Sequence, residues 1–194
     1  MNKISAHNAI TRGIEIYFDR LKDTLDTLNR EEIIFFLDTL LEARTNGRQI
    51  FIMGNGGSAA TASHFVCDFN KGLSTTEQPR FKFICLNDNV PSMMAYANDV
   101  SYDDVFVEQL KNLMQKNDLV IGISGSGNSM NVVKAIEYAN ANGAKTFCLV
   151  GYDGGKLREC AQRSLHVAIN NMQIVEDIHM IIDHMGMSVL RNQC

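Results

Sequence analysis

The chain has 194 residues, of which 45% are hydrophobic and 21% are charged. This size and composition are typical of one globular domain and exclude a disordered or fibrous protein. The formal net charge is -4, from 22 acidic and 18 basic side chains without a long run of either sign, so we expect no nucleic-acid partner.

Cysteine use and hydropathy predict a cytoplasmic protein. The cysteines contain no C-x-x-C pair, which is typical of free thiols in a reducing compartment rather than of disulfides or a cysteine zinc site. They are Cys67, Cys85, Cys148, Cys160 and Cys194. The N-terminus lacks an apolar core of signal-peptide length and no later stretch approaches the length of a membrane span, so we expect no membrane partner.

The chain begins with a helical arm. Apolar positions recur at helical spacing from about residue 6 to residue 45, with a break at Asn29 or Arg30 and a stop at Asn46 and Gly47. We therefore predict two helices within residues 1–47 and an α/β sandwich over residues 48–194. Because no linker or low-complexity segment separates the two parts, residues 1–194 are interpreted as a single domain.

Short apolar runs then alternate with helical patterns. Five runs have the length and residue types of buried strands, namely QIFIM, FKFICL, DLVIGI, KTFCLVG and SLHVAI. Helical patterns separate them, and a long final helix is expected from Met172 to Leu190. Strands that alternate with helices predict an α/β fold, with a five-stranded parallel sheet sandwiched by helices and preceded by the helical arm.

Two loops rich in glycine and serine follow the first and third predicted strands. They are GNGGS, Gly54 to Ser58, and SGSGNS, Ser124 to Ser129. Ligands of open α/β sheets bind beyond the carboxyl ends of strands, where helix N-termini offer unpaired N–H groups and a partial positive charge. Glycine lets amides turn toward an anion and serine hydroxyls donate to phosphate oxygens, so the loops favour a small sugar phosphate.

Other interpretations of these loops differ in strength. Either loop alone is equally well explained as a tight turn with a serine N-cap. The second loop lacks the spacing of the nucleotide P-loop. GNGGSA satisfies G-x-G-x-x-A, but the next strand ends in Asn87 and Asp88, more than 30 residues after Gly54, where the dinucleotide pattern expects an acidic residue about 20 positions on. We therefore expect no nicotinamide or flavin cofactor.

Two pairs of metal-ligating residue types occur at helical spacing. His64 and Asp68 are four residues apart, which is one turn along one face of a helix. Glu176 and His184 are eight apart, about two turns along the last helix. Two imidazoles and two carboxylates that converge can form a divalent-metal site of the zinc type.

The remaining helical and strand histidines carry weaker signals. A lone helical histidine, His64 and His184 included, is more often a cap or a satisfied interior group than a ligand, and only the family resemblance described below favours those two as ligands. His179, with Asp183 four residues later, fits such an interior pair, and His166 in the strand SLHVAI gives no functional signal.

Five segments, taken together, resemble a known family. GNGGSAATASHF, YANDVSYDDVF, GISGSGNSMNVVKAI, GYDGGKL and EDIHMIIDH are similar, in order and spacing, to the sugar isomerase (SIS) domain of the phosphoheptose isomerases. The resemblance runs from about Gln49 to His184. It implies a flavodoxin-like three-layer SIS fold and a homotetramer with active sites at subunit interfaces. It also implies interconversion of sedoheptulose 7-phosphate and D-glycero-D-manno-heptose 7-phosphate, in the heptose biosynthesis of lipopolysaccharide.

The resemblance also implies roles for individual residues. The serine loop would hold the phosphate, while the first glycine loop and the Asn98–Asp99 pair would help to hold the sugar. One zinc-type divalent ion would bind at each site through His64, Asp68, Glu176 and His184, and Asp68, His184 and Glu176 would be catalytic. The implied substrate-binding set is Asn55, Gly56, Gly57, Ser58, Asp68, Asn98, Asp99, Ser124, Gly125, Ser126, Ser129 and Glu176.

Two positions depart from the family pattern. Asp68 stands where the family has a glutamate that binds metal and serves as the base, and Glu176 stands where it has a glutamine. Aspartate is one methylene shorter, so its carboxylate falls back by about 1.5 Å. The two exchanges together keep a reachable carboxylate, which leaves either Asp68 or Glu176 as the base. A different metal preference or a different sugar phosphate would explain the two departures equally well.

The sequence therefore favours a metal-dependent ketose–aldose isomerase of a seven-carbon sugar phosphate. The main alternative is a non-catalytic SIS module of the replication-initiator-associating type, which binds a sugar phosphate or a protein partner. The presence of all four predicted metal-site side chains argues against that module. A sugar-phosphate sensor or a hexose-phosphate isomerase would share the phosphate loop.

Overall fold

The computed structural model describes residues 3–74 and 79–191, so Cys194 lies outside the described residues. In chain order the helices are α1 (Lys3–Asp26), α2 (Arg30–Thr45), α3 (Gly57–Cys67), α4 (Val90–Asp99), α5 (Val105–Leu113), α6 (Met130–Ala141), α7 (Gly155–Cys160) and α8 (Met172–Arg191). A π-helical turn, η1 (Asp68–Gly72), extends α3, and a 3₁₀ turn, η2 (Tyr102–Asp104), precedes α5. The strands are β1 (Ile50–Gly54), β2 (Phe83–Cys85), β3 (Leu119–Ser124), β4 (Lys145–Gly151) and β5 (Arg163–Val167).

The strands form one sheet in the order β2-β1-β3-β4-β5. Every pairing between neighbours is parallel, which confirms the predicted five-stranded parallel sheet. The run FKFICL is a strand only over Phe83–Cys85, where it pairs with Ile50–Ile52. It is an edge strand, so β1 is its single neighbour in the sheet.

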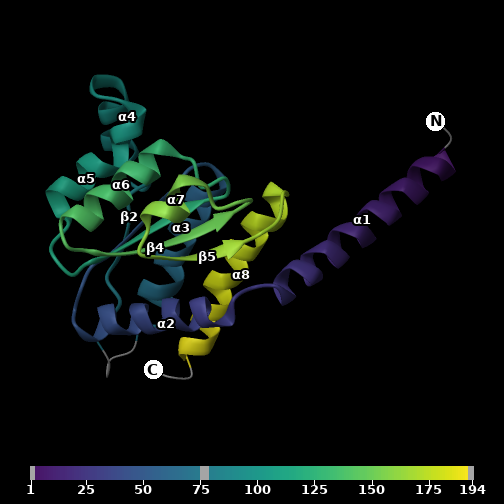
Figure 1. The fold of residues 1–194 in the computed structure, drawn as a ribbon, viewed down its shortest axis with the longest axis horizontal. Helices are drawn as coiled ribbons and strands as arrows, with labels where there is room; N and C mark the ends of the chain where they lie inside the picture. The colour runs from purple at the N-terminus through teal and green to yellow at the C-terminus, as the bar shows by residue number, and fades with distance from the viewer. Residues whose placement is uncertain (1–2, 75–78, 192–194) are drawn as a thin grey trace.

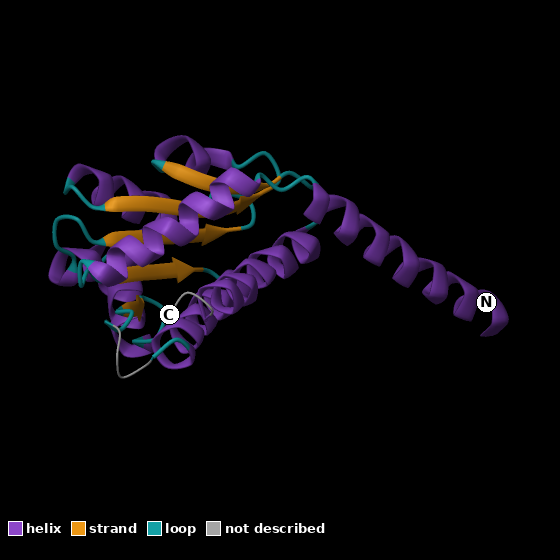
Figure 2. Cartoon of the chain, turned by 90° about the horizontal axis from the view of Figure 1, so that it is seen from below, coloured by secondary structure: helices purple, strands orange, loops and turns teal. Residues whose placement is uncertain are grey.

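Helices cover both faces of the sheet (Figure 2). Because successive strand side chains point to opposite faces, β1 sends Ile50 and Ile52 into one hydrophobic core and Phe51 and Met53 into the other. The first core also contains side chains of α2, α3 and α8, and the second contains those of α5, α6 and α7. All residues of β1 and β3 are buried, as a parallel sheet covered on both faces requires.

The N-terminal arm consists of two helices, and α1 projects away from the sandwich (Figure 1). The predicted break is the N-cap Asn29, whose side-chain oxygen accepts a hydrogen bond from the N–H of Glu31 at 2.9 Å. The hydroxyl of Tyr17 on α1 donates to Asp177 on α8 at 2.5 Å, which ties the arm to the last helix. Although α1 is long, neither it nor any other described helix is apolar enough over sufficient length to cross a membrane.

Candidate functional site

The two glycine and serine loops meet at the carboxyl edge of the sheet. β1 and β3, which precede them, are neighbours, with Gly54 in register with Ile123. The chain passes from β1 to β2 on one side and then to β3 on the other, so the direction of winding reverses between β1 and β3. Ligands of open α/β sheets bind at such a reversal. The topology therefore brings both predicted ligand loops to one place.

A pocket lies between these loops. Its polar lining consists of side chains from both loops and from α8, namely Asn55, Ser58, Ser124, Ser126, Ser129 and Glu176. The hydroxyls of Ser124 and Ser129 lie 3.0 Å apart, and the N–H of Gly127 donates to Oγ of Ser124 at 3.1 Å. Gly127 has a φ of 67°, a backbone conformation that glycine adopts without strain. The serine loop therefore offers neutral donors to an anion, while Glu176 brings a carboxylate to the same pocket.

Glu176 reaches this pocket from α8. Its carboxylate lies against the backbone of Gly57, since a methyl group added there would meet both Oε1 and Oε2 at 2.5 Å. Gly57 is the first residue of α3, and the N-terminal end of a helix carries a partial positive charge that favours a nearby carboxylate. Glycine at position 57 therefore leaves the space that the Glu176 carboxylate occupies.

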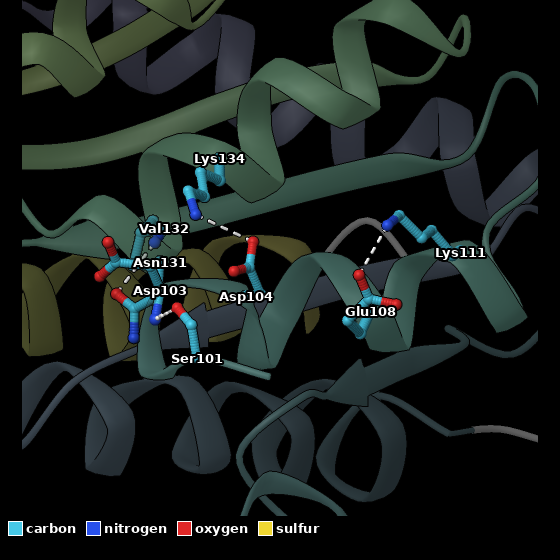
Figure 3. Close-up of polar contacts among 8 residues, drawn as sticks. All are labelled: Ser101, Asp103, Asp104, Glu108, Lys111, Asn131, Val132 and Lys134. Carbon is cyan, nitrogen blue, oxygen red and sulfur yellow. Dashed lines mark hydrogen bonds and ion pairs between the residues drawn. The ribbon is translucent and has the colours of Figure 1, made fainter. Parts of the chain in front are cut away.

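Asn55, at the mouth of the pocket, is held by two further elements. Its amide exchanges two hydrogen bonds of 2.9 Å with the amide of Asn131, and its Oδ1 also accepts from the Tyr102 hydroxyl at 2.8 Å. Lys134 on α6 pairs with Asp104 at 2.9 Å and fixes η2 against α6 (Figure 3). The hydrogen bond from Lys134 lowers the pKa of Asp104. These contacts orient Asn55 before any ligand arrives.

The predicted sugar-binding pair Asn98–Asp99 ends α4. Nδ2 of Asn98 donates to Oδ1 of Asp99 at 2.7 Å, and both residues are exposed. Neither residue lines the pocket between the two loops. Their contact with a sugar stays a prediction.

Four metal-ligating side chains converge where α3 and η1 meet α8. Nε2 of His64 lies 3.0 Å from Nε2 of His184 and 3.7 Å from Oδ2 of Asp68. With a carboxylate oxygen of Asp183, the ligand atoms of all four residues lie within 4.8 Å of one another. A tetrahedral site with bonds of about 2.1 Å has ligand atoms about 3.4 Å apart. Two imidazoles and two carboxylates at these separations fit a divalent cation of the zinc type.

Asp183 forms the buried side of this His–Asp cluster. Its exposed fraction is 0%, whereas the side chains of His64 and Asp68 are 42% and 19% exposed. Neither carboxylate oxygen of Asp183 has a hydrogen-bond partner among the residues that the structure describes. Burial, with a smaller effect of the Asp68 carboxylate, raises the pKa of Asp183 to about 8. The cluster therefore has a buried floor and an exposed outer side.

Comparison with known proteins shows to which family the chain belongs. The family model described as the SIS domain matches residues 16–151. The chain belongs to the SIS-domain family. The probable phosphoheptose isomerase of Thermoplasma acidophilum is 39% identical over 158 residues, which are 81% of this chain and 86% of that protein. The phosphoheptose isomerase of Helicobacter pylori is 36% identical over 177 residues, 91% of each chain. Within the SIS-domain family, this chain therefore groups with the phosphoheptose isomerases, and the predicted isomerase class is confirmed.

Solved structures agree on the fold. The phosphoheptose isomerase of Neisseria gonorrhoeae superposes with a TM-score of 0.85 at 26% identity, over 93% of this chain and 98% of that one. A phosphoheptose isomerase from Francisella tularensis has the same TM-score of 0.85 at 23% identity, over 100% of both chains, and supports the fold alone. The predicted three-layer SIS sandwich is confirmed.

One residue of the His–Asp cluster was not predicted from the sequence as a metal ligand. The sequence pairs Asp183 with His179, whereas the structure groups Asp183 with the His–Asp cluster. A signal was present, because Asp183 follows Glu176 by seven residues, about two helical turns, and so shares its side of α8. Glu176 is not one of the four clustered residues, and its predicted role as a metal ligand stays a prediction.

Proposed function

We propose that this SIS-domain isomerase is a metal-dependent ketose–aldose isomerase that converts sedoheptulose 7-phosphate to D-glycero-D-manno-heptose 7-phosphate. The observation that carries the proposal is that α3 and α8 each run from the anion pocket to the His–Asp cluster. Ser58 and Glu176 line the pocket, and His64 and His184 belong to the cluster. A ligand held by its phosphate in the pocket therefore has its other end directed along these helices.

The separation between the anion pocket and the His–Asp cluster suits a seven-carbon sugar chain. Ser58 and His64 are six residues apart on α3, which corresponds to about 9 Å along the helix axis. In an extended zigzag chain, six carbon–carbon bonds of about 1.5 Å each reach about 7.5 Å from end to end. The phosphate lies beyond that length. A heptose 7-phosphate bound at the serine loop would thus bring C1 and C2 close to His64, Asp68 and His184.

The serine loop is proposed to hold the phosphate through hydroxyls and backbone amides. Ser124, Ser126 and Ser129 supply the hydroxyls, and the N-terminus of α6 adds a favourable dipole. Asn55, Gly56, Gly57 and Ser58 would face the sugar together with Asn98 and Asp99, and Gly125 would contribute its backbone N–H to the phosphate. Neutral donors bind such a dianion without the bulk of a lysine or arginine side chain.

The proposed reaction moves a proton between C1 and C2 through an enediolate. It needs a carboxylate as base and an acid near the two substrate oxygens. Asp68 in the cluster or Glu176 in the pocket would be the base, and His184, which is exposed, would be the acid. A bound divalent cation, zinc by the donor types, would stabilise negative charge on the developing oxyanion.

A homotetramer is part of the proposal. Helix α1 projects from the sandwich and carries large exposed apolar side chains at four-residue spacing, Ile10, Ile14 and Phe18. Such a stripe favours burial against another copy of the same helix. The outer side of the His–Asp cluster is also exposed, which agrees with the active sites at subunit interfaces that the family resemblance implies. The cytoplasmic location and the role in lipopolysaccharide heptose biosynthesis stay predictions from the sequence.

Substitution of the two candidate bases tests the chemistry. Asp68→Asn and Glu176→Gln keep the side-chain shapes, but an amide cannot accept the proton. If Asp68 is the base, Asp68→Asn abolishes exchange of the substrate C1 proton with solvent, followed by NMR, while Glu176→Gln keeps appreciable turnover. The ranking reverses if Glu176 is the base.

The matched control for this pair is Asp177→Asn. Asp177 is an exposed carboxylate beside Glu176 that binds Tyr17 instead of the pocket, so its removal is expected to leave exchange intact. Undiminished exchange in the Asp68→Asn and Glu176→Gln double variant would contradict the proposed carboxylate mechanism.

A further inference from the structure

The carboxylate of Asp183 has no partner that accounts for its burial. Its exposed fraction is 0%, and neither oxygen accepts or donates a hydrogen bond within residues 3–74 and 79–191. Burial of a polar group without a compensating partner costs free energy, and burial of a charged group costs more. A side chain that compensates this cost is therefore missing from the described part of the chain, and a cation can supply the compensation.

The surroundings of Asp183 are those of a ligand. One of its carboxylate oxygens lies within 4.8 Å of the ligand atoms of His64, Asp68 and His184. Those three residues could hold a cation with one position open, and a carboxylate oxygen of Asp183 on the buried side would add a fourth protein ligand. We infer that Asp183 is a ligand of the divalent cation and brings a buried carboxylate to the floor of the site. This inference rests on the metal dependence proposed above.

Glu176 is the competing carboxylate on the same helix. The two residues are seven apart, about 10.5 Å along the axis of α8. The Glu176 carboxylate lies against Gly57 at the start of α3 and lines the anion pocket, and it is not one of the four clustered residues. One helix thus offers one carboxylate to the sugar-phosphate pocket and another to the cation.

The inferred ligand set gives the cation site a defined open side. Asp183 approaches from the protein interior, whereas His184 is exposed and His64 is 42% exposed. A substrate oxygen would therefore enter as a fifth ligand from the side of the two imidazoles, while Asp183 remains out of its path. Asp183 is accordingly a ligand and a positioning residue, and the base is one of the two accessible carboxylates.

Cation binding by the parent protein, Asp183→Asn and Glu176→Gln tests the inference. Metal-free protein is titrated with Co²⁺ and with Zn²⁺, and binding is followed by calorimetry and by the visible absorption of bound Co²⁺. Asp183→Asn is expected to weaken binding at least tenfold and to change the Co²⁺ bands, because one coordinating oxygen is lost. Glu176→Gln is expected to change the affinity less than threefold and to keep the parent spectrum.

The outcomes separate this inference from the proposed function. If the parent binds neither cation, metal dependence fails and the role of Asp183 fails with it. If the parent binds and Asp183→Asn binds equally well with the same spectrum, the role of Asp183 alone is overturned. Weakening in both variants with a spectral change in each supports Asp183 as a ligand and adds Glu176 to the set.

A second variant covers a failure of Asp183→Asn to fold. Asp183→Ala removes the buried carboxylate completely, and its thermal unfolding is compared with that of the parent with and without Zn²⁺. The cation is expected to raise the unfolding midpoint of the parent and to leave that of Asp183→Ala nearly unchanged. An equal rise in both proteins would mean that Asp183 is structural and would overturn the inference.

Discussion

Among single residues of the serine loop, Ser126 is the hydroxyl most available to a ligand. Ser124 is buried, and its Oγ is engaged by Ser129 and by the N–H of Gly127. Ser126 is half-buried, and its oxygen accepts from the N–H of Asn128 at 3.3 Å, which leaves its O–H free to donate. A phosphate oxygen in the pocket would receive that hydrogen bond.

The substitution Ser126→Ala is predicted to weaken binding of phosphorylated sugar selectively. A hydrogen bond to a charged group contributes about 1.5 to 3 kcal/mol, equivalent to roughly 10- to 100-fold in affinity. Calorimetry with sedoheptulose 7-phosphate and with sedoheptulose measures the effect, and Ser164→Ala on β5, outside the pocket, is the control. If Ser126→Ala left the ratio of the two affinities unchanged, the loop would not be the phosphate site.

At the scale of elements, α8 holds most of the ionisable groups of the site, and it also holds a fully buried histidine. His179 has an exposed fraction of 0%, and burial lowers its pKa to about 4. The unfolded chain keeps the ordinary pKa of about 6.5. Between these values the unfolded chain binds more protons at His179 than the folded chain, so the contribution of His179 to stability falls as the pH falls from about 6.5 to about 4.

We predict that His179→Leu reduces the acid sensitivity of the metal-free protein. Urea unfolding of the parent and the variant, each at pH 7 and pH 5, gives the difference in unfolding free energy between the two pH values. The loss from pH 7 to pH 5 is expected to be smaller in the variant than in the parent. Asp183, whose pKa is raised to about 8, acts in the opposite direction in both proteins and largely cancels in the comparison. Equal losses in parent and variant would contradict burial of a neutral His179.

The sequence predicts elements better than it predicts contacts between them. The buried strands and the two loops could be located because apolar runs, glycines and serines are local signals. The two loops could also be expected at the same edge of the sheet, because the strands before them are parallel. The grouping of Asp183 with His64 and Asp68 depends on how α8 packs against α3 and η1. The spacing of residues along one helix carries no information about that packing. The same limit applies to Glu176, since its contact with Gly57 joins residues more than 100 positions apart.

For the molecule as a whole, the N-terminal arm is the part proposed to mediate association between copies of the chain. Helix α1 carries exposed apolar residues along the part that projects from the sandwich (Figure 1). The hydroxyl of Tyr17 on α1 donates a hydrogen bond of 2.5 Å to Asp177 on α8. The acceptor Asp177 raises the pKa of Tyr17 to about 12, so this hydroxyl stays protonated and keeps donating at ordinary pH. The orientation of the arm is thereby linked to the helix that carries Glu176.

The double substitution Ile14→Glu and Phe18→Glu is predicted to dissociate the proposed tetramer. Both side chains are exposed on α1 and would be buried in the assembly, where unpaired carboxylates are unfavourable. Size-exclusion chromatography with light scattering measures the mass, and Lys22→Glu, at an exposed polar position of the same helix, is the control. A monomeric parent, or a double variant with the mass of the parent, would contradict the role given to α1.

Proton-exchange NMR with sedoheptulose 7-phosphate, on protein of known metal content, tests metal-dependent isomerisation by this chain. We predict conversion to the aldose with exchange of the C1 proton, loss of both after chelation, and recovery after addition of one zinc ion per chain. We also predict that His64→Ala and His184→Ala fold but lose both the metal and the conversion. Full conversion by protein shown to contain no metal would contradict metal-dependent isomerisation.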